Sequence, residues 1–328
     1  MTAPTDRPLV LTVRTPEDVL AMVPVLLGFV PEDSVVMLTF GGRRPFHARV
    51  DLPRGPDALD DVEEVVAQLL APVRAQAVRQ VLFVLYTADA PVASLAVERL
   101  ATVFRGAGVE VVEALRTDGR CWWPGLRDRA GVPAGGVPYD VGSHPLTVEA
   151  VLAGKAVLGS REQLAHTMAH APELAAGVVA ALAAMSTTAG GRAGRASGAP
   201  PRAEVAARVG AGLATYADGA AAPDDATIAW LLRALLDPGA REAAAELMTA
   251  GTAAQHAGFW TEVVRRSPET LVAGPAALLA FAAWRAGDGA RAWCAVDRCL
   301  DADPDHPLGR VVAAALTHAL PPDCWPDD

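Results

Sequence analysis

The chain has 328 residues, which is long enough for two domains of ordinary size. Hydrophobic residues make up 52% of the chain and charged residues 20%, so packed cores are expected. The formal net charge of −10 argues against nucleic acid as a partner, because phosphate contacts need concentrated Lys and Arg.

The first predicted helix begins after Thr15. A threonine hydroxyl can accept a backbone N–H of the first turn, Pro16 needs no N–H there, and the Asp18 carboxylate suits the positive end of the helix dipole. Apolar residues then recur at helical spacing until Gly28, and Pro24 is expected to bend the helix. These signals specify where the helix starts and stops.

A predicted β-hairpin follows, with strands from Ser34 to Phe40 and from Phe46 to Leu52. Strict alternation in the second strand points His47, Arg49 and Asp51 away from the apolar residues between them. We favour an edge strand with one face in water, as is common in antiparallel sheets. The alternative is that the three polar residues line a pocket.

Strand and helix patterns continue to alternate along the first half of the chain. The expected elements are a strand at Leu9–Val13 before the first helix, a helix at Asp57–Val78, a strand at Gln80–Thr87, a helix at Ala90–Gly106, a strand at Val109–Thr117 and a short strand at Arg120–Trp123. This order predicts an α/β domain over residues 1–145, with a mixed sheet of about five or six strands covered by helices. Trp122 and Trp123 should face opposite sides of that sheet.

The second half of the chain has helical patterns throughout. Residues 146–186 are expected to form a helical connecting segment, and residues 187–202, which are rich in Gly, Ala and Pro, a flexible linker. An all-helical domain is predicted over residues 203–328. Before these segments, the Gly- and Pro-rich stretch 131–144 reads as a long loop, and such loops are often functional.

One helical hairpin in the last domain has a recognisable form. The stretch from Leu278 to Pro304 resembles a tetratricopeptide unit, with Gly287 at the turn, Ala292 in the second helix and Leu300 near its end. Such a helix pair cannot bury both of its faces alone and needs neighbouring helices. The C-terminal domain is therefore expected to be tetratricopeptide-like.

Several motifs together resemble a known family. The stretch TPEDVLAMVPVLLGFVPEDSVV followed by RVDLP resembles the opening of an actinobacterial family catalogued only as domain of unknown function 4192. The resemblance continues in DGRCWW, GVPYD, EAVLAGKAVLGSREQL and PAALLAFAAWRAGDGARAW, and it covers nearly the whole chain. It implies no activity.

Signatures of common catalytic sites are absent from the sequence. No GxGxxG follows a strand, and neither GxxxxGK[ST] nor GxSxG occurs. His166 and His170 stand four apart, as zinc ligands on one helix face would, but Thr167 replaces the glutamate of metalloproteases. We favour a solvated helix face and expect neither a metal nor a cofactor.

The remaining features concern the surroundings of the protein. The four cysteines, Cys121, Cys294, Cys299 and Cys324, are scattered and form no CxxC pair, so reduced structural thiols are expected. No apolar run approaches the roughly 20 residues of a membrane helix, and the N-terminus does not resemble a signal peptide. We therefore expect a cytoplasmic protein without a membrane partner.

Seven polar residues are candidates for a ligand-binding site or a structural polar cluster: Arg14, Asp18, Asp33, Ser34, Arg49, Asp51 and Tyr139. In the favoured interpretation, the charged members pair with one another and brace the hairpin against the first helix. In the alternative, Arg49 holds an anionic ligand and Asp51 orients it. If the first interpretation holds, Arg49→Ala leaves an uncompensated carboxylate and lowers the free energy of unfolding by about 3 to 5 kcal/mol.

Two functions remain open from the sequence. The first is a non-enzymatic protein-interaction or regulatory module, in which the helical C-terminal domain offers a groove to a protein partner. The second is a small-molecule enzyme or ligand-binding domain with a polar site at the edge of the N-terminal sheet. No catalytic residue is identified, because Ser34 has no recognisable base.

Overall fold

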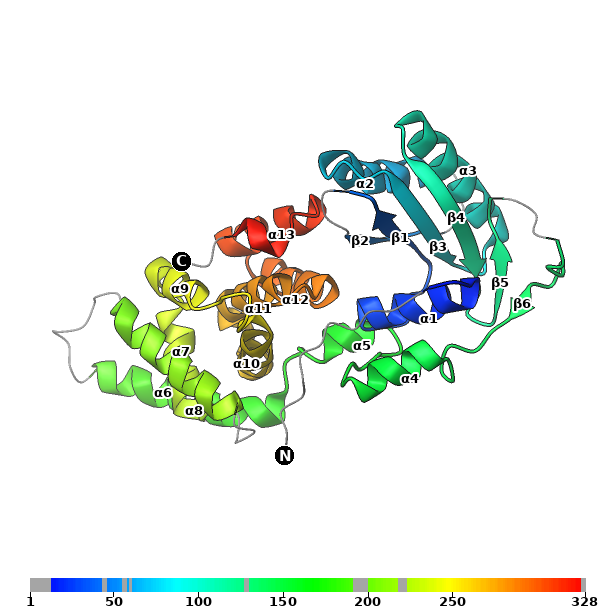
Figure 1. The fold of residues 1–328 in the computed structure, drawn as a ribbon. Helices are drawn as coiled ribbons and strands as arrows, with labels where there is room; N and C mark the ends of the chain where they lie inside the picture. Colours follow the sequence, from blue (N-terminus) through cyan, green and yellow to red (C-terminus); the bar gives the residue numbers. More distant parts are fainter. Residues whose placement is uncertain are drawn as a thin grey trace. The chain divides into compact units, whose positions relative to one another are not determined.

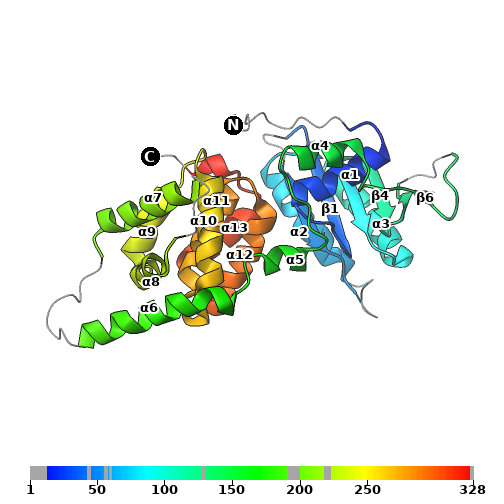
Figure 2. The same cartoon turned by 90° about the horizontal axis from the view of Figure 1, so that it is seen from below.

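The computed structural model describes residues 13–42, 46–54, 58, 61–126, 130–190, 200–217 and 223–325. The chain divides into two units, Met1–Arg161 and Glu162–Asp328, which are considered separately below. Figures 1 and 2 show a sheet with helices on both of its faces in the first unit and helices in the second. The expected order of an α/β part followed by an all-helical part is confirmed. Within the described ranges, no helix combines the length and apolar character that crossing a bilayer requires.

The first unit contains a six-stranded mixed sheet. Its strands are β1 (Ser34–Phe40), β2 (His47–Asp51), β3 (Gln80–Tyr86), β4 (Glu110–Thr117), β5 (Cys121–Pro124) and β6 (Val137–Pro138). They lie in the order β2-β1-β3-β4-β5-β6, in which β3 and β4 are parallel and the other neighbours antiparallel. The helices are α1 (Pro16–Leu27), α2 (Val62–Ala75), α3 (Ala90–Gly106) and α4 (Pro145–Leu152). The strand expected at Leu9–Val13 falls on residues outside the described ranges, except for Val13.

The two faces of the sheet have separate cores. One core joins residues of α2 and α3 to Val35, Phe83 and other side chains of the sheet, and the opposite core joins α1 to Val36, Val84 and Leu115. Figure 1 shows α1 on one side of the sheet, with α2 and α3 on the other. These helices therefore bury both faces of the central strands, whose sequences are nearly continuously apolar.

Strand β2 lies at one edge of the sheet, as the favoured interpretation requires. Its apolar residues Ala48 and Val50 pack on the core of α2 and α3. Register pairs Arg49 with Val36 and Asp51 with Ser34, so these polar side chains share the α1 face of the sheet. The predicted alternation is confirmed.

The second unit is built from eight longer helices within the described residues. They are α6 (Pro172–Gly190), α7 (Arg202–Ala217), α8 (Asp225–Ala234), α9 (Pro238–Glu246), α10 (Ala253–Arg266), α11 (Ala273–Arg285), α12 (Gly289–Ala302) and α13 (Pro307–Thr317), with short 3₁₀ turns η1 (Glu269–Leu271) and η2 (Pro322–Cys324). Helix α11 is central, because α9, α10, α12 and α13 all pack on it and every residue from Pro275 to Arg285 is buried.

The region between the sheet and the later helices differs in detail from the sequence-based expectation. Helix α5 (Arg161–His166) spans the boundary between the units, and α6 packs on α8 and α10 within the second unit. Helix α6 extends to Gly190 and therefore continues four residues into the segment 187–202 that we expected to be a linker. Residues 191–199 of that segment lie outside the described ranges.

Candidate functional site

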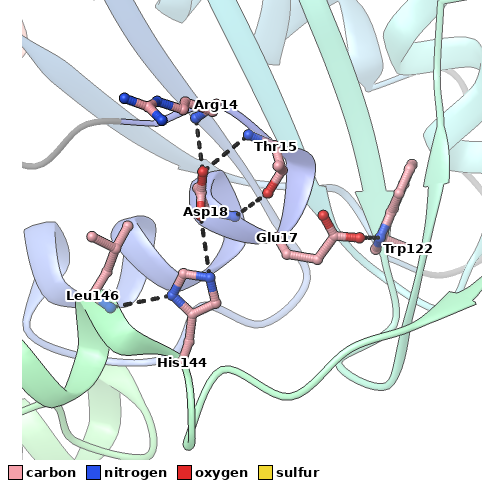
Figure 3. Close-up of polar contacts among 7 residues, drawn as sticks. All are labelled: Arg14, Thr15, Glu17, Asp18, Trp122, His144 and Leu146. Atoms are coloured by element: carbon pink, nitrogen blue, oxygen red, sulfur yellow. Dashed lines mark hydrogen bonds and ion pairs between the residues drawn. The ribbon is translucent and has the colours of Figure 1, made fainter.

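The first group of polar contacts lies at the N-terminus of α1 (Figure 3). Asp18 Oδ2 accepts the backbone N–H of Arg14 at 2.8 Å and of Thr15 at 3.0 Å, and Thr15 Oγ1 accepts the N–H of Asp18 at 3.2 Å. This reciprocal capping box confirms the predicted helix start. The hydrogen bond from the backbone of Arg14 is the largest influence that lowers the pKa of Asp18, and partial burial opposes it. The carboxylate is therefore held in its charged form.

His144 connects this helix end to α4 (Figure 3). Its Nε2 lies 3.2 Å from Asp18 Oδ1, and its Nδ1 accepts the backbone N–H of Leu146 at 3.3 Å, in the first turn of α4. A neutral imidazole with its proton on Nε2 satisfies both contacts, because Nδ1 then keeps its lone pair. The seven candidates did not include His144. Its position directly before Pro145, at a helix start, was the available sequence signal.

A second contact at this helix end involves tryptophan. Trp122 Nε1 donates a hydrogen bond to Glu17 Oε1 at 2.9 Å, and the Trp122 ring is buried in the core beneath α1. Trp123 faces the other way, with the Arg116 guanidinium 3.9 Å from its ring centroid. The two rings thus lie on opposite faces, as predicted from strand alternation. Trp122 ties the end of α1 to β5.

Buried hydroxyl groups form a row on the same face of the sheet. Ser34 and Tyr86 are paired across β1 and β3, and neither hydroxyl has a hydrogen-bond partner among the described residues. In the same row, Thr117 Oγ1 and Tyr139 OH are 2.8 Å apart. Burial raises the pKa of Tyr86 well above its ordinary value and also raises the pKa of Tyr139. Both phenols therefore remain neutral.

Arg49 has three neighbours at the sheet edge. Its Nη2 lies 2.6 Å from Asp51 Oδ1 and 3.4 Å from the carbonyl oxygen of Glu32. The guanidinium carbon lies 5.6 Å from the ring centroid of Phe29. The Arg49 side chain is only 15% exposed, whereas that of Asp51 is 72% exposed. The Arg49 side chain is therefore largely removed from water, whereas the Asp51 carboxylate remains solvated.

Asp33 pairs with Arg54, which is not one of the seven candidate residues. Its Oδ2 lies 2.9 Å from Arg54 Nη2, and both side chains are exposed. The Asp33 backbone has a φ of 35°, an unusual value for a residue other than glycine, although aspartate tolerates it better than most residues. Its carbonyl accepts the N–H of Leu52 at 2.8 Å, so the residue closes the turn into the hairpin.

The seven candidates thus lie in three groups. Arg14 and Asp18 cap α1, with Arg14 contributing its backbone N–H; Asp33, Arg49 and Asp51 lie where β1 and β2 meet; and Ser34 and Tyr139 belong to the row of hydroxyls. Each charged side chain of Asp18, Asp33, Arg49 and Asp51 has a nearby partner. Arg49 and Asp51 pair with each other, whereas Asp18 contacts His144 and Asp33 contacts Arg54, which were not among the candidates. The described contacts therefore form separate local pairs and do not form the expected network that would brace the hairpin against the first helix.

The two histidines considered as metal ligands do not share a helix. Helix α5 ends at His166, whereas His170 lies between that helix and α6, so the prediction of one common helix face was wrong. The chain turns between them, where Thr167 Oγ1 donates to the carbonyl of Leu164. In the described ranges, His, Cys, Asp and Glu side chains do not gather in a group of three that could hold a metal ion.

Comparison with known proteins identifies the family. Neither a curated protein nor a solved structure matches the chain. A family model does match, over residues 16–323, and this span includes the capped helix, the whole sheet and the helices of the second unit. Because the match extends over nearly the entire chain, this protein belongs to the family described as Domain of unknown function (DUF4192).

Proposed function

We propose that the chain is a non-enzymatic protein-interaction module that binds its partner through the helical second unit. The observation that carries this proposal is the surface of α6. From Leu174 to Gly190 the sequence of this helix has no Asp, Glu, Lys, Arg or His, and about half of its residues between Leu174 and Ser186 are exposed to solvent. Val179, for example, is 50% exposed. Figure 2 shows α6 along the outside of this unit.

Comparison with α7 shows why this surface is unusual. Helix α7 is also rich in alanine, but Arg202, Glu204 and Arg208 place charges along it, and these residues form ion pairs. An alanine-rich composition alone therefore does not remove charge from a helix of this unit. Depletion of charged residues marks the centres of protein interfaces, and exposed apolar patches mark interaction sites. Helix α6 has no charged residue after Glu173, and its large apolar side chains Leu174 and Val179 are exposed.

The helices that resemble a tetratricopeptide unit would provide a rigid framework that carries α6. Helix α13 begins 34 residues after α11 begins, which equals the tetratricopeptide period, and Gly287 has a φ of 77° at the turn between α11 and α12. However, α11 is buried from Pro275 to Arg285, so its sides do not line an open groove. We therefore assign the partner surface to α6.

The test introduces charge on the exposed face of α6. Val179 and Ala183 are both exposed and one helical turn apart, so Val179→Glu with Ala183→Glu places two carboxylates on this face. The matched control is Ala207→Glu, at an exposed alanine of α7. Tagged chains are used to recover partners from extract of the native host, and recovery is quantified by mass spectrometry. We expect the control to recover the wild-type partner and the double variant to lose it by about tenfold or more.

Equal recovery by all three chains would contradict the proposal, as would a wild-type chain that recovers no partner. The melting temperature of each variant shows that it is folded. Both substituted faces are exposed, so we expect little change in the melting temperature.

A second function, binding of a small molecule by the first unit, is supported by one observation. The Ser34 and Tyr86 hydroxyls are buried without described partners, and buried polar groups usually have one. Pairing of the charged candidates weighs against this function. We therefore rank it below the interaction module.

A further inference from the structure

The C-terminal segment of the chain is held at the carboxyl end of α11. Trp284 Nε1 donates a hydrogen bond to the carbonyl of Leu320 at 3.1 Å. Arg285 Nη1 donates to the carbonyl of Pro322 at 3.0 Å and also to that of Trp325. The Trp325 ring packs edge-on against Phe281, with 5.1 Å between ring centroids. Four contacts thus fix residues 320–325 on the end of one helix.

These contacts involve the backbone of residues 320–325 more than their side chains. All three hydrogen bonds end on main-chain carbonyls of the segment. The segment contains Pro321 and Pro322, which have no N–H and therefore offer carbonyl acceptors without competing donors. Pro321 has a φ of −73° and a ψ of 147°, and the chain then turns in η2 (Pro322–Cys324) before Trp325. The carbonyls of Pro322 and Trp325, on either side of this turn, both accept hydrogen bonds from Arg285 Nη1.

We propose that Phe281, Trp284 and Arg285 form a recognition site for a segment in which a Pro-Pro pair enters a 3₁₀ turn that ends at an aromatic residue. Residues 320–325 occupy this site within the same chain, and a segment of the same chemistry from a partner protein replaces them. This site is separate from α6, so it adds a second surface to the interaction function proposed above and stands or falls independently of it.

Exposure of the occupying segment supports its replacement. Leu320 is 41% exposed and Trp325 42% exposed, so both large side chains keep much of their surface in water. Arg285 is buried and lies in the last turn of α11, where its charge suits both the helix dipole and incoming carbonyls. The receiving residues are therefore fixed in the helix, whereas the occupant is only partly covered.

Residues 320–325 are covalently linked to their binding site, and this link determines the affinity that a partner segment needs in order to replace them. A segment joined by a short connection competes at an effective concentration on the order of millimolar. A free peptide at micromolar concentration therefore competes poorly with the intact segment. Removing the aromatic anchor of the occupant should open the site to that peptide.

The experiment measures binding of a labelled peptide to the full chain by fluorescence anisotropy. The probe is the synthetic peptide His-Ala-Leu-Pro-Pro-Asp-Ser-Trp, which is the sequence of residues 318–325 with serine in place of Cys324. We expect the full chain carrying Trp325→Ala to bind this peptide at least about tenfold more tightly than the wild-type chain. A peptide in which alanine replaces tryptophan should bind about tenfold more weakly to the same chain.

A matched pair of tryptophan variants tests the receiving side. In the Trp325→Ala chain, Trp284→Phe removes the Nε1 donor and should weaken peptide binding about tenfold. Trp230→Phe, in α8, is the control and should leave binding unchanged, because the Trp230 ring stacks with Arg208 elsewhere in the unit. A folded Trp325→Ala chain that binds the peptide no better than wild type would overturn the proposal.

A second measurement covers the case in which Trp325→Ala does not fold. Cys324 is exposed, whereas Cys294 and Cys299 are buried, so a fluorophore can be attached at Cys324 in a Cys121→Ser chain. Titration with the unlabelled peptide to millimolar concentration should release the segment and change the fluorescence. No change over that range would also overturn the proposal.

Discussion

The two units of the chain bury different kinds of polar side chain. Among the described residues, the buried polar residues of the first unit are Ser34, Thr39, Thr87 and Thr117, whereas those of the second are His256, Ser267, Arg285 and His306. Hydroxyl groups of Ser and Thr stay neutral at every pH of interest, but histidine changes charge near neutrality. Burial lowers the pKa of His47 in the first unit as well as that of His256 and His306 in the second, so mild acid should destabilise both units and the helical unit more.

The largest expected effect is the loss of stability of the second unit in acid. Burial lowers the pKa of His256, which is 1% exposed, to about 4. Between pH 6.5 and about 4 the unfolded state takes up a proton that the folded state does not, so stability falls as the pH falls. The slope is about 1.4 kcal/mol per pH unit and the total loss about 3 kcal/mol.

Hydrogen exchange measured between pH 7 and pH 4.5 tests this difference, because it reports each unit separately. After correction for the intrinsic pH dependence of exchange, protection should fall in α10 and its neighbours before it falls in the sheet. His256→Gln, which cannot take up the proton, should flatten the pH dependence. Equal loss of protection in both units would show that the buried histidines do not make the helical unit the more acid-sensitive one.

The next effect belongs to the first unit, at the capped end of α1. Asp18→Ala removes the acceptor for two backbone N–H groups and the partner of His144, and should lower the free energy of unfolding by about 2 to 3 kcal/mol. Urea melts at pH 7 measure this loss, and Asp18→Asn, which keeps an acceptor oxygen, should lose less. Because the pKa of Asp18 is lowered, its contribution is present above pH 4 and disappears only as the pH falls through the folded-state pKa.

A smaller loss is expected for Arg49→Ala. The structure changes our sequence-based figure of about 3 to 5 kcal/mol, because the carboxylate left behind belongs to Asp51, which is 72% exposed and remains solvated. Loss of packing on Phe29 and of the contact with Glu32 leaves about 1 to 2 kcal/mol. Arg54→Ala, at the exposed ion pair with Asp33, is the control and should stay within about 0.5 kcal/mol. Matching urea midpoints for the two variants would contradict this distinction.

The smallest effects come from two tyrosines in one row. Tyr86→Phe removes a buried hydroxyl without a described partner, so stability should stay equal or rise by up to about 1 kcal/mol. Tyr139→Phe removes the hydrogen bond with Thr117 and should lower stability by about 1 kcal/mol. Thermal melts of the two variants give the comparison. A clear loss for Tyr86→Phe would reveal a polar partner for that hydroxyl and would strengthen the ligand-binding alternative.

Local sequence signals predicted the fold well. The capping residues Thr15 and Asp18 and the alternation around Arg49 are local patterns, and each has its expected place in the structure. The sequence placed His170 on one helix with His166, but the helix ends four residues earlier than that pairing requires. A short helix with few buried residues has weak periodicity, so its end was poorly specified.

The candidate site was predicted less well, because its contacts depend on tertiary placement. Asp18 contacts His144 because α4 packs beside α1. No sequence pattern near either residue predicts this contact. The burial of His256 likewise follows from the packing of α10 in the second unit. Residue type alone suggests which groups can pair. The arrangement of the helices decides which of them do.

Strand β2 has a further consequence, which concerns the protein at high concentration. An edge strand carries backbone groups that another chain can pair with, and charged side chains on such a strand oppose that pairing. Strand β2 has only five residues, and two of them, Arg49 and Asp51, are charged. Short length and charged side chains are the features by which natural edge strands oppose such pairing, so we expect β2 to resist edge-to-edge association.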